Sequence, residues 1–163
     1  LSFAVVMHEG GHLLAMAVCG ANPERITFYG GGIALSKSGM ESLTDAKRLV
    51  ILSAGCSVNL LVAAACFAMQ GNDTAAVFGA VNLIICIFNA LPIGYFDGAE
   101  VLELLLTGFV SLRTAEKVKK IVGTALALII TAGVIVYCVM CGESVSLSLF
   151  FVVLFLIQAQ LVS

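Results

Sequence analysis

The two histidines of the chain lie four residues apart in the segment His8-Glu9-Gly10-Gly11-His12, with a carboxylate between them. On an α-helix this spacing places both imidazoles on one face, one turn apart, where they can bind the same Zn²⁺. Glu9 then lies close enough to take a proton from a water molecule at the metal. The pattern therefore predicts a metal-dependent hydrolase with His8 and His12 as ligands and Glu9 as the catalytic base.

The surroundings of this motif are apolar. Hydrophobic residues make up 61% of the chain and charged residues 11%, and the mean hydropathy is +1.12. Soluble domains are far less apolar. The composition predicts an integral membrane protein in a lipid bilayer. We expect no nucleic-acid partner, although the formal net charge of −2 says nothing about one.

Long uncharged segments predict the membrane helices, because about 20 apolar residues cross a bilayer. We expect helices up to about residue 19 and over about 48–70, 74–92, 121–141 and 144–163. Segment 98–119 combines a leucine run with many charges, and we expect a partly embedded helix that turns into a cytoplasmic loop. The predicted fold class is an all-α polytopic membrane protein, a bundle of about five to six transmembrane helices with a small re-entrant or β-hairpin segment at residues 26–35.

The basic residues predict the orientation in the membrane. All eight Lys and Arg lie either between residues 25 and 48 or between residues 113 and 120. Cytoplasmic loops carry such an excess, so both of these connections are expected in the cytoplasm. The first helix then reaches the cytoplasm near residue 20, and His12 lies roughly 12 Å inside that surface at 1.5 Å per residue.

A third metal ligand is needed, because a catalytic zinc usually has three protein ligands. With only two histidines in the chain, the third must be a carboxylate or a thiolate. Asp97 is the best candidate, since it follows the uncharged segment 74–92 and approaches from the same cytoplasmic side. Pro92 and Gly94 interrupt the helix before it, and irregular backbone at membrane depth is found where it lines a cavity. The alternative is that Asp97 caps a helix or forms a turn with the following glycine.

Three motifs in order make the chain similar to the site-2 protease family of intramembrane zinc metalloproteases, which includes bacterial enzymes that process sporulation and stress-response regulators. The motifs are HExxH at residues 8–12, Gly-x-x-x-Asn from Gly55 to Asn59, and Asn-x-x-Pro…Asp-Gly at Asn89, Pro92, Asp97 and Gly98. The resemblance covers about residues 1–105. The chain departs from the family pattern at Cys56, Tyr95 and Ala99, none of which is a ligand or the base.

The resemblance implies a mechanism and a location. It implies that His8, His12 and Asp97 bind Zn²⁺, and that Glu9 acts as general base and then general acid in peptide hydrolysis. The expected enzyme is an intramembrane zinc-dependent endopeptidase that cleaves a transmembrane or membrane-associated protein near the cytoplasmic face. We expect a multi-pass protein of the bacterial cell membrane, with its active site toward the cytoplasmic side.

Two amides and a glycine-rich segment are candidates for substrate binding. Asn59 and Asn89 lie in lipid-depth helices, where they are candidates for holding the substrate backbone or the oxyanion; the alternative is hydrogen bonding between helices. Asn82 belongs to no motif and is expected to be structural. Residues 26–35 can pair as a strand with an unwound substrate, or form a flexible turn.

We expect a single transmembrane metalloprotease domain over residues 1–163, with a catalytic core at 1–105 and additional membrane helices at 121–163. Because the chain begins within a helix, we expect it to be truncated at the N-terminus. The alternative function is a catalytically inactive membrane scaffold, or a metal-handling membrane protein of the same fold. The intact Glu9 argues against the first, and the few polar residues in the other spans argue against the second.

Overall fold

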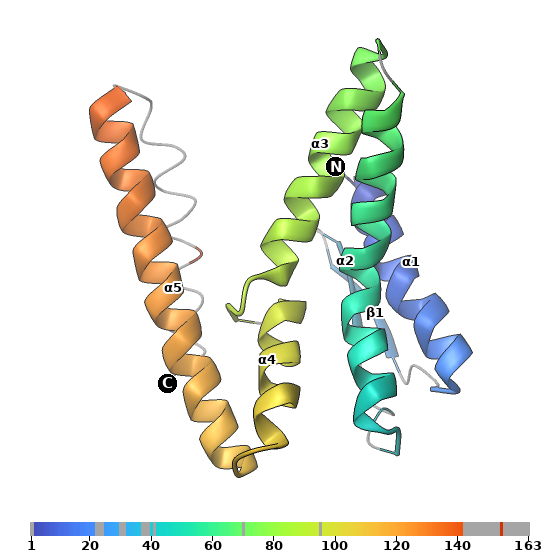
Figure 1. Cartoon of the computed structure of the whole chain (residues 1–163), viewed down its shortest axis with the longest axis vertical. Coiled ribbons are helices and arrows are strands. Elements are labelled where there is room, and N and C mark those ends of the chain that lie inside the picture. The colour runs from blue at the N-terminus through green and yellow to red at the C-terminus, as the bar shows by residue number, and fades with distance from the viewer. Residues whose placement is uncertain are drawn as a thin grey trace. The chain divides into compact units, whose positions relative to one another are not determined.

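The structure is a computed structural model that describes residues 2–21, 25–29, 32–36, 40, 42–69, 71–94, 96–141 and 154. The helix predicted over 144–163 therefore lies outside the described residues, apart from residue 154. The elements are α1 (Ser2–Cys19), β1 (Arg25–Tyr29), β2 (Gly32–Ser36), α2 (Asp45–Ala68), α3 (Asp73–Ala90), α4 (Asp97–Thr107) and α5 (Leu112–Cys141) (Figure 1). They divide into two compact units, Leu1–Ala90 and Leu91–Ser163.

In the first unit, α1, α2 and α3 pack against one another (Figure 1). Helices in a membrane associate through close packing, because lipid provides no hydrophobic driving force between them. Glycines at the interface permit this close approach. A β-carbon added at Gly11 of α1 would lie 2.9 Å from the Ala54 carbonyl oxygen of α2. A β-carbon at Gly79 of α3 would lie 2.9 Å from the Cys66 Cβ of α2. Both helix pairs therefore pack with their backbones close together.

The two strands of the first unit form a small antiparallel pair. Arg25 lies opposite Ser36, and Tyr29 lies opposite Gly32. Strand β2 also lies beside α1, the helix that carries both histidines. The chain thus places extended backbone next to the helix of the predicted metal ligands.

The second unit contains α4 packed against α5, and it corrects the prediction for segment 98–119. Helix α4 ends at Thr107 and α5 begins at Leu112, so residues 112–120 are the first turns of a helix rather than a loop. Lys119 of α5 forms an ion pair with Glu103 of α4, and Ala115 is fully buried. The charges that suggested a loop are instead distributed around a helix that packs one face against its neighbour.

Side chains in this protein are sorted in the manner of a membrane protein. The buried polar side chains of the described residues include His8, His12, Asn59 and Asn82, whereas large apolar side chains are exposed, for example Leu14 at 66% and Phe109 at 89%. Such a pattern is typical of a protein in a lipid environment, where polar groups face the interior of the protein.

Three helices of the described chain, α2, α3 and α5, are long and apolar enough to cross a membrane, and α1 contains a shorter apolar helix from Phe3 to Cys19. The predicted class of a helical membrane protein is therefore confirmed at this level. The total of five to six transmembrane helices stays a prediction, as does the division into one domain.

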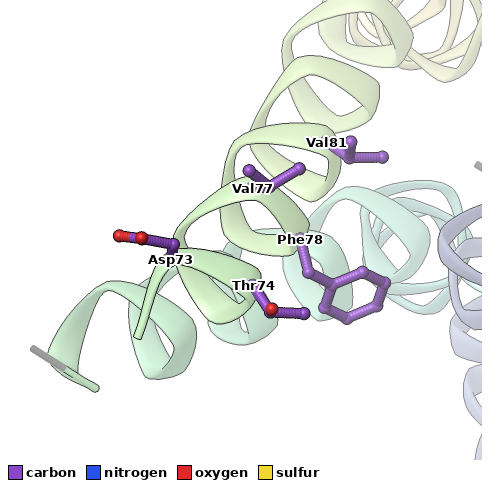
Figure 2. Close-up of a pocket in the computed structure, with 5 residues that line it drawn as sticks. All are labelled: Asp73, Thr74, Val77, Phe78 and Val81. Carbon is purple, nitrogen blue, oxygen red and sulfur yellow. The ribbon is translucent and has the colours of Figure 1, made fainter. Parts of the chain in front are cut away.

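An open hollow lies along the first turns of α3. It is lined by Asp73, Thr74, Val77, Phe78 and Val81, and in Figure 2 the carboxylate of Asp73 points away from the Phe78 ring. None of the residues predicted to bind metal or substrate lines it. The candidate site is elsewhere in the first unit, around the histidines of α1.

Candidate metal centre

His8 and His12 lie one turn apart on α1, and both are buried, with exposures of 4% and 1%. Their Nε2 atoms are 3.2 Å apart. The rings meet edge to face, with an interplanar angle of 81°. The four-residue spacing has thus brought one nitrogen of each imidazole to a common point inside the protein.

The other nitrogen of His12 is held by the main chain of α2. Its Nδ1 lies 2.7 Å from the carbonyl oxygen of Ile51. A carbonyl oxygen only accepts hydrogen bonds, so Nδ1 must carry the proton and donate it. In the neutral imidazole, Nε2 then has no proton and presents its lone pair.

The other nitrogen of His8 is held by a side chain of α2. His8 Nδ1 lies 3.1 Å from Asn59 Oδ1. The amide nitrogen of Asn59 donates to the Ala4 carbonyl at 3.3 Å and to Asn82 Oδ1 at 3.1 Å, which leaves the amide oxygen facing His8. His8 Nδ1 is therefore the donor, and its Nε2 also presents a lone pair.

This donor set fits a zinc ion. Two unprotonated ring nitrogens that face each other repel unless a cation draws both lone pairs toward it. Two nitrogens at 2.0–2.1 Å from one tetrahedral zinc are roughly 3.3 Å apart, close to the 3.2 Å between the Nε2 atoms. Each ligating imidazole of a zinc site also donates its second N–H to an oxygen acceptor, as both do here.

Gly55 of α2 leaves open the space beside these nitrogens. A β-carbon added there would lie 2.4 Å from His12 Nε2 and 2.8 Å from His8 Nε2. Asn59, which follows one turn later on the same face of α2, accepts the hydrogen bond of His8. The Gly-x-x-x-Asn motif therefore supplies both the space for the two ring nitrogens and the acceptor that fixes one of them. In the sequence, Gly55 is recognisable as the first residue of this motif, but its contact with the two imidazoles leaves no local signal.

Glu9 and Asp97 complete the predicted catalytic set. Glu9 is half-buried on α1, between the two histidines. Asp97 is the first residue of α4 and is 6% exposed, and Phe96 occupies the cap position before it. Asp97 belongs to the second unit, and its pairing with the two histidines of the first unit stays a prediction.

The three asparagines of the bundle have different surroundings. Asn59 is fully buried, with all its described contacts inside the first unit. Asn89 is half-buried near the end of α3 and donates to the Ile85 carbonyl at 2.9 Å. For both, a role in substrate binding stays a prediction. Asn82, which belongs to no motif, is fully buried and contacts Asn59; the available sequence signal was its polarity within an apolar helix.

Comparisons with known proteins found one matching family model and a similar solved structure. The family model described as Peptidase family M50 matches residues 70–133. Among solved structures, the chain is similar to the Site-2 Protease from Methanocaldococcus jannaschii, with a TM-score of 0.70 and 20% identity, over 97% of this chain and 73% of that chain. A search of curated proteins found no significant match. The family match includes Asn89 and Asp97, whereas residues 8–12 precede it.

Proposed function

We infer that this chain, a member of the site-2 protease family, is a zinc-dependent endopeptidase that cuts its substrate within or beside the membrane. One observation carries this proposal: the Nε2 atoms of His8 and His12 are 3.2 Å apart, and each Nδ1 donates to an oxygen of α2. This arrangement prepares two lone pairs for one cation in an otherwise apolar environment. Buried ionisable groups in a membrane helix are costly and mark functional sites.

We propose that Asp97 is the third zinc ligand. Asp97 is 6% exposed, and a carboxylate is one of the usual third ligands of a catalytic zinc that is also bound by two histidines. Its place in the Asn-x-x-Pro…Asp-Gly motif supports this role.

The chemistry then divides between the metal and Glu9. A zinc ion bound by these ligands would polarise the scissile carbonyl and make a water molecule more acidic. Glu9 takes the proton of the attacking water and passes it to the leaving amine nitrogen. Its half-buried position on α1 supports this assignment, because a base must reach both the site and the proton it transfers. Asn89 is assigned to the substrate or to the oxyanion of the transition state.

The substrate is proposed to be a transmembrane or membrane-associated protein that is cut near the cytoplasmic face of a bacterial cell membrane. The basic residues of the chain gather at positions that favour the cytoplasm. Peptide hydrolysis requires an extended substrate, because helical hydrogen bonds hide its carbonyls. Strand β2 lies beside α1, and the β1–β2 pair offers backbone to which an unwound peptide can add as a strand.

The test uses the full chain purified in detergent. Metal content is measured by mass spectrometry, and cleavage of a panel of single-span membrane proteins is followed with and without a zinc chelator. We expect about one zinc per chain, cleavage near the cytoplasmic end of the span, and loss of cleavage with the chelator that added zinc restores. Zinc binding without cleavage of any span would favour the inactive scaffold, and a chain without zinc would overturn the metal centre itself.

A further inference from the structure

We propose that Asn82 of α3 is a positioning residue for the metal ligand His8, and that it acts through Asn59 of α2. The inference rests on the proposed metal centre. Asn82 and Asn59 are both 0% exposed and are among the largest fully buried side chains of the described residues. Neither amide caps the end of a helix. Helix capping therefore does not explain why two uncharged polar groups are buried at membrane depth.

The hydrogen bonds are all donated in one direction, from His8 of α1 through Asn59 of α2 to Asn82 of α3. The Phe78 carbonyl can only accept, so the Asn82 amide nitrogen faces it, at 2.9 Å. The Asn82 oxygen therefore points away and accepts from the Asn59 nitrogen, at 3.1 Å. The Asn59 oxygen is left to accept from His8 Nδ1, at 3.1 Å. Each amide can thus take only one of its two orientations.

This direction decides which nitrogen of His8 is available to the metal. If the Asn59 amide rotated by a half turn, its NH₂ group would face His8 Nδ1, which would then have to accept a hydrogen bond. His8 would carry its proton on Nε2 and lose the lone pair that binds zinc. The same rotation would place the Asn59 oxygen against the oxygens of Asn82 and Ala4, two acceptors. Asn82 therefore opposes the tautomer of His8 that cannot bind metal.

The test measures metal affinity, not cleavage. Co²⁺ serves as the probe because its visible absorption reports the coordination geometry, and Zn²⁺ affinity is measured by competition with a chromophoric chelator. We expect Asn82→Leu to lower the affinity for both ions about tenfold, the lower end of the usual effect of groups that orient a ligand. The Co²⁺ spectrum should also change, because part of the population has His8 in the other tautomer.

A second background separates orientation from packing. In Asn59→Asp, whichever side-chain oxygen faces His8 Nδ1 accepts its hydrogen bond, and the other faces the oxygens of Ala4 and Asn82, so Asn82 no longer supports the ligating tautomer of His8. Asn82→Leu should then no longer lower metal affinity in the Asn59→Asp background. If Asn82→Leu does not yield folded protein, Asn82→Ala is compared in the same two backgrounds. The matched control is Asn72→Ala, an exposed amide just before α3 that accepts from the Ala75 N–H, which should leave affinity unchanged.

The outcomes are distinguishable. A loss in the unmodified background that disappears in the Asn59→Asp background supports the inference. An equal loss in both backgrounds, or no loss in either, overturns it and leaves Asn82 with a packing role. If the unmodified chain binds neither Co²⁺ nor Zn²⁺, the proposed metal centre fails, and the role of Asn82 fails with it.

Discussion

Gly55 faces His12 so closely that a β-carbon on the glycine would lie 2.4 Å from the imidazole Nε2. No rearrangement of a flexible side-chain end relieves such a contact, because the imidazole is also held at Nδ1 by the Ile51 carbonyl. The absence of a side chain at residue 55 is therefore a requirement of the proposed metal centre. It is as specific a requirement as the two histidines.

Gly55→Ala should lower zinc affinity by at least tenfold, because the methyl group displaces the ligating nitrogen, and should cost about 1–3 kcal/mol of unfolding free energy as an overpacked site. Chelator competition and thermal unfolding in detergent measure the two effects. Gly79→Ala is the matched control, since its β-carbon would lie 2.9 Å from Cys66 Cβ. It should reduce stability but preserve zinc affinity; an alanine at 55 that binds zinc normally would contradict the described geometry.

Glu9→Gln should retain zinc but lower the rate of peptide cleavage by about 10²–10⁴-fold, because the amide cannot accept the proton of the attacking water. Zinc content and the initial rate of substrate cleavage are measured on the same preparation. Loss of zinc together with activity would indicate a structural role for Glu9, and full activity would exclude it as the base.

Asp97→Asn should weaken zinc binding by more than the tenfold expected for a residue that only orients a ligand, because the amide removes the negative charge offered to the metal. The control is Glu100→Gln in the same first turn of α4, which should leave zinc affinity within about twofold, the ordinary result for a residue outside the ligand set. Equal zinc affinity in Asp97→Asn and the unmodified chain would remove Asp97 as the third ligand.

The two glycines within the HExxH motif should respond in opposite ways to alanine. At Gly11 a β-carbon would lie 2.9 Å from the Ala54 carbonyl oxygen, whereas at Gly10 it would meet nothing within 4 Å. Gly11→Ala should therefore cost about 1–3 kcal/mol of unfolding free energy, since the backbone of α2 cannot yield locally. Gly10→Ala should gain about 0.5–1 kcal/mol from helix propensity. Thermal unfolding of both variants in one detergent decides the signs.

The sequence was sufficient to predict those elements that follow from local pattern. Apolar runs of bilayer length predicted helices over 48–70 and 74–92, and the structure has α2 at Asp45–Ala68 and α3 at Asp73–Ala90. The start of α5 at Leu112 was not predicted, because the basic residues between 113 and 120 favoured a cytoplasmic loop. Lys119 is accommodated through an ion pair with Glu103, sixteen positions earlier, and such a tertiary contact leaves no local signal.

The candidate site shows the same limit. The spacing of His8 and His12 predicted their common face on α1, because helical periodicity is a local property. Which group receives each Nδ1 proton depends on how α1 meets α2, which sequence spacing does not specify. Asn82, with no motif of its own, was expected to be structural, and its hydrogen bond with Asn59 at 3.1 Å depends in the same way on how α2 meets α3.

The two imidazoles donate to different kinds of acceptor, and a point mutation can remove one of these acceptors but not the other. The carbonyl that receives the His12 proton belongs to the backbone at Ile51 and is present whichever amino acid is encoded there. The acceptor for His8 is the side chain of Asn59, which a single codon change can remove. A descendant of this protein could therefore lose much of the proposed metal affinity while every letter of its HExxH signature stayed intact, and a motif search would still count it as an enzyme.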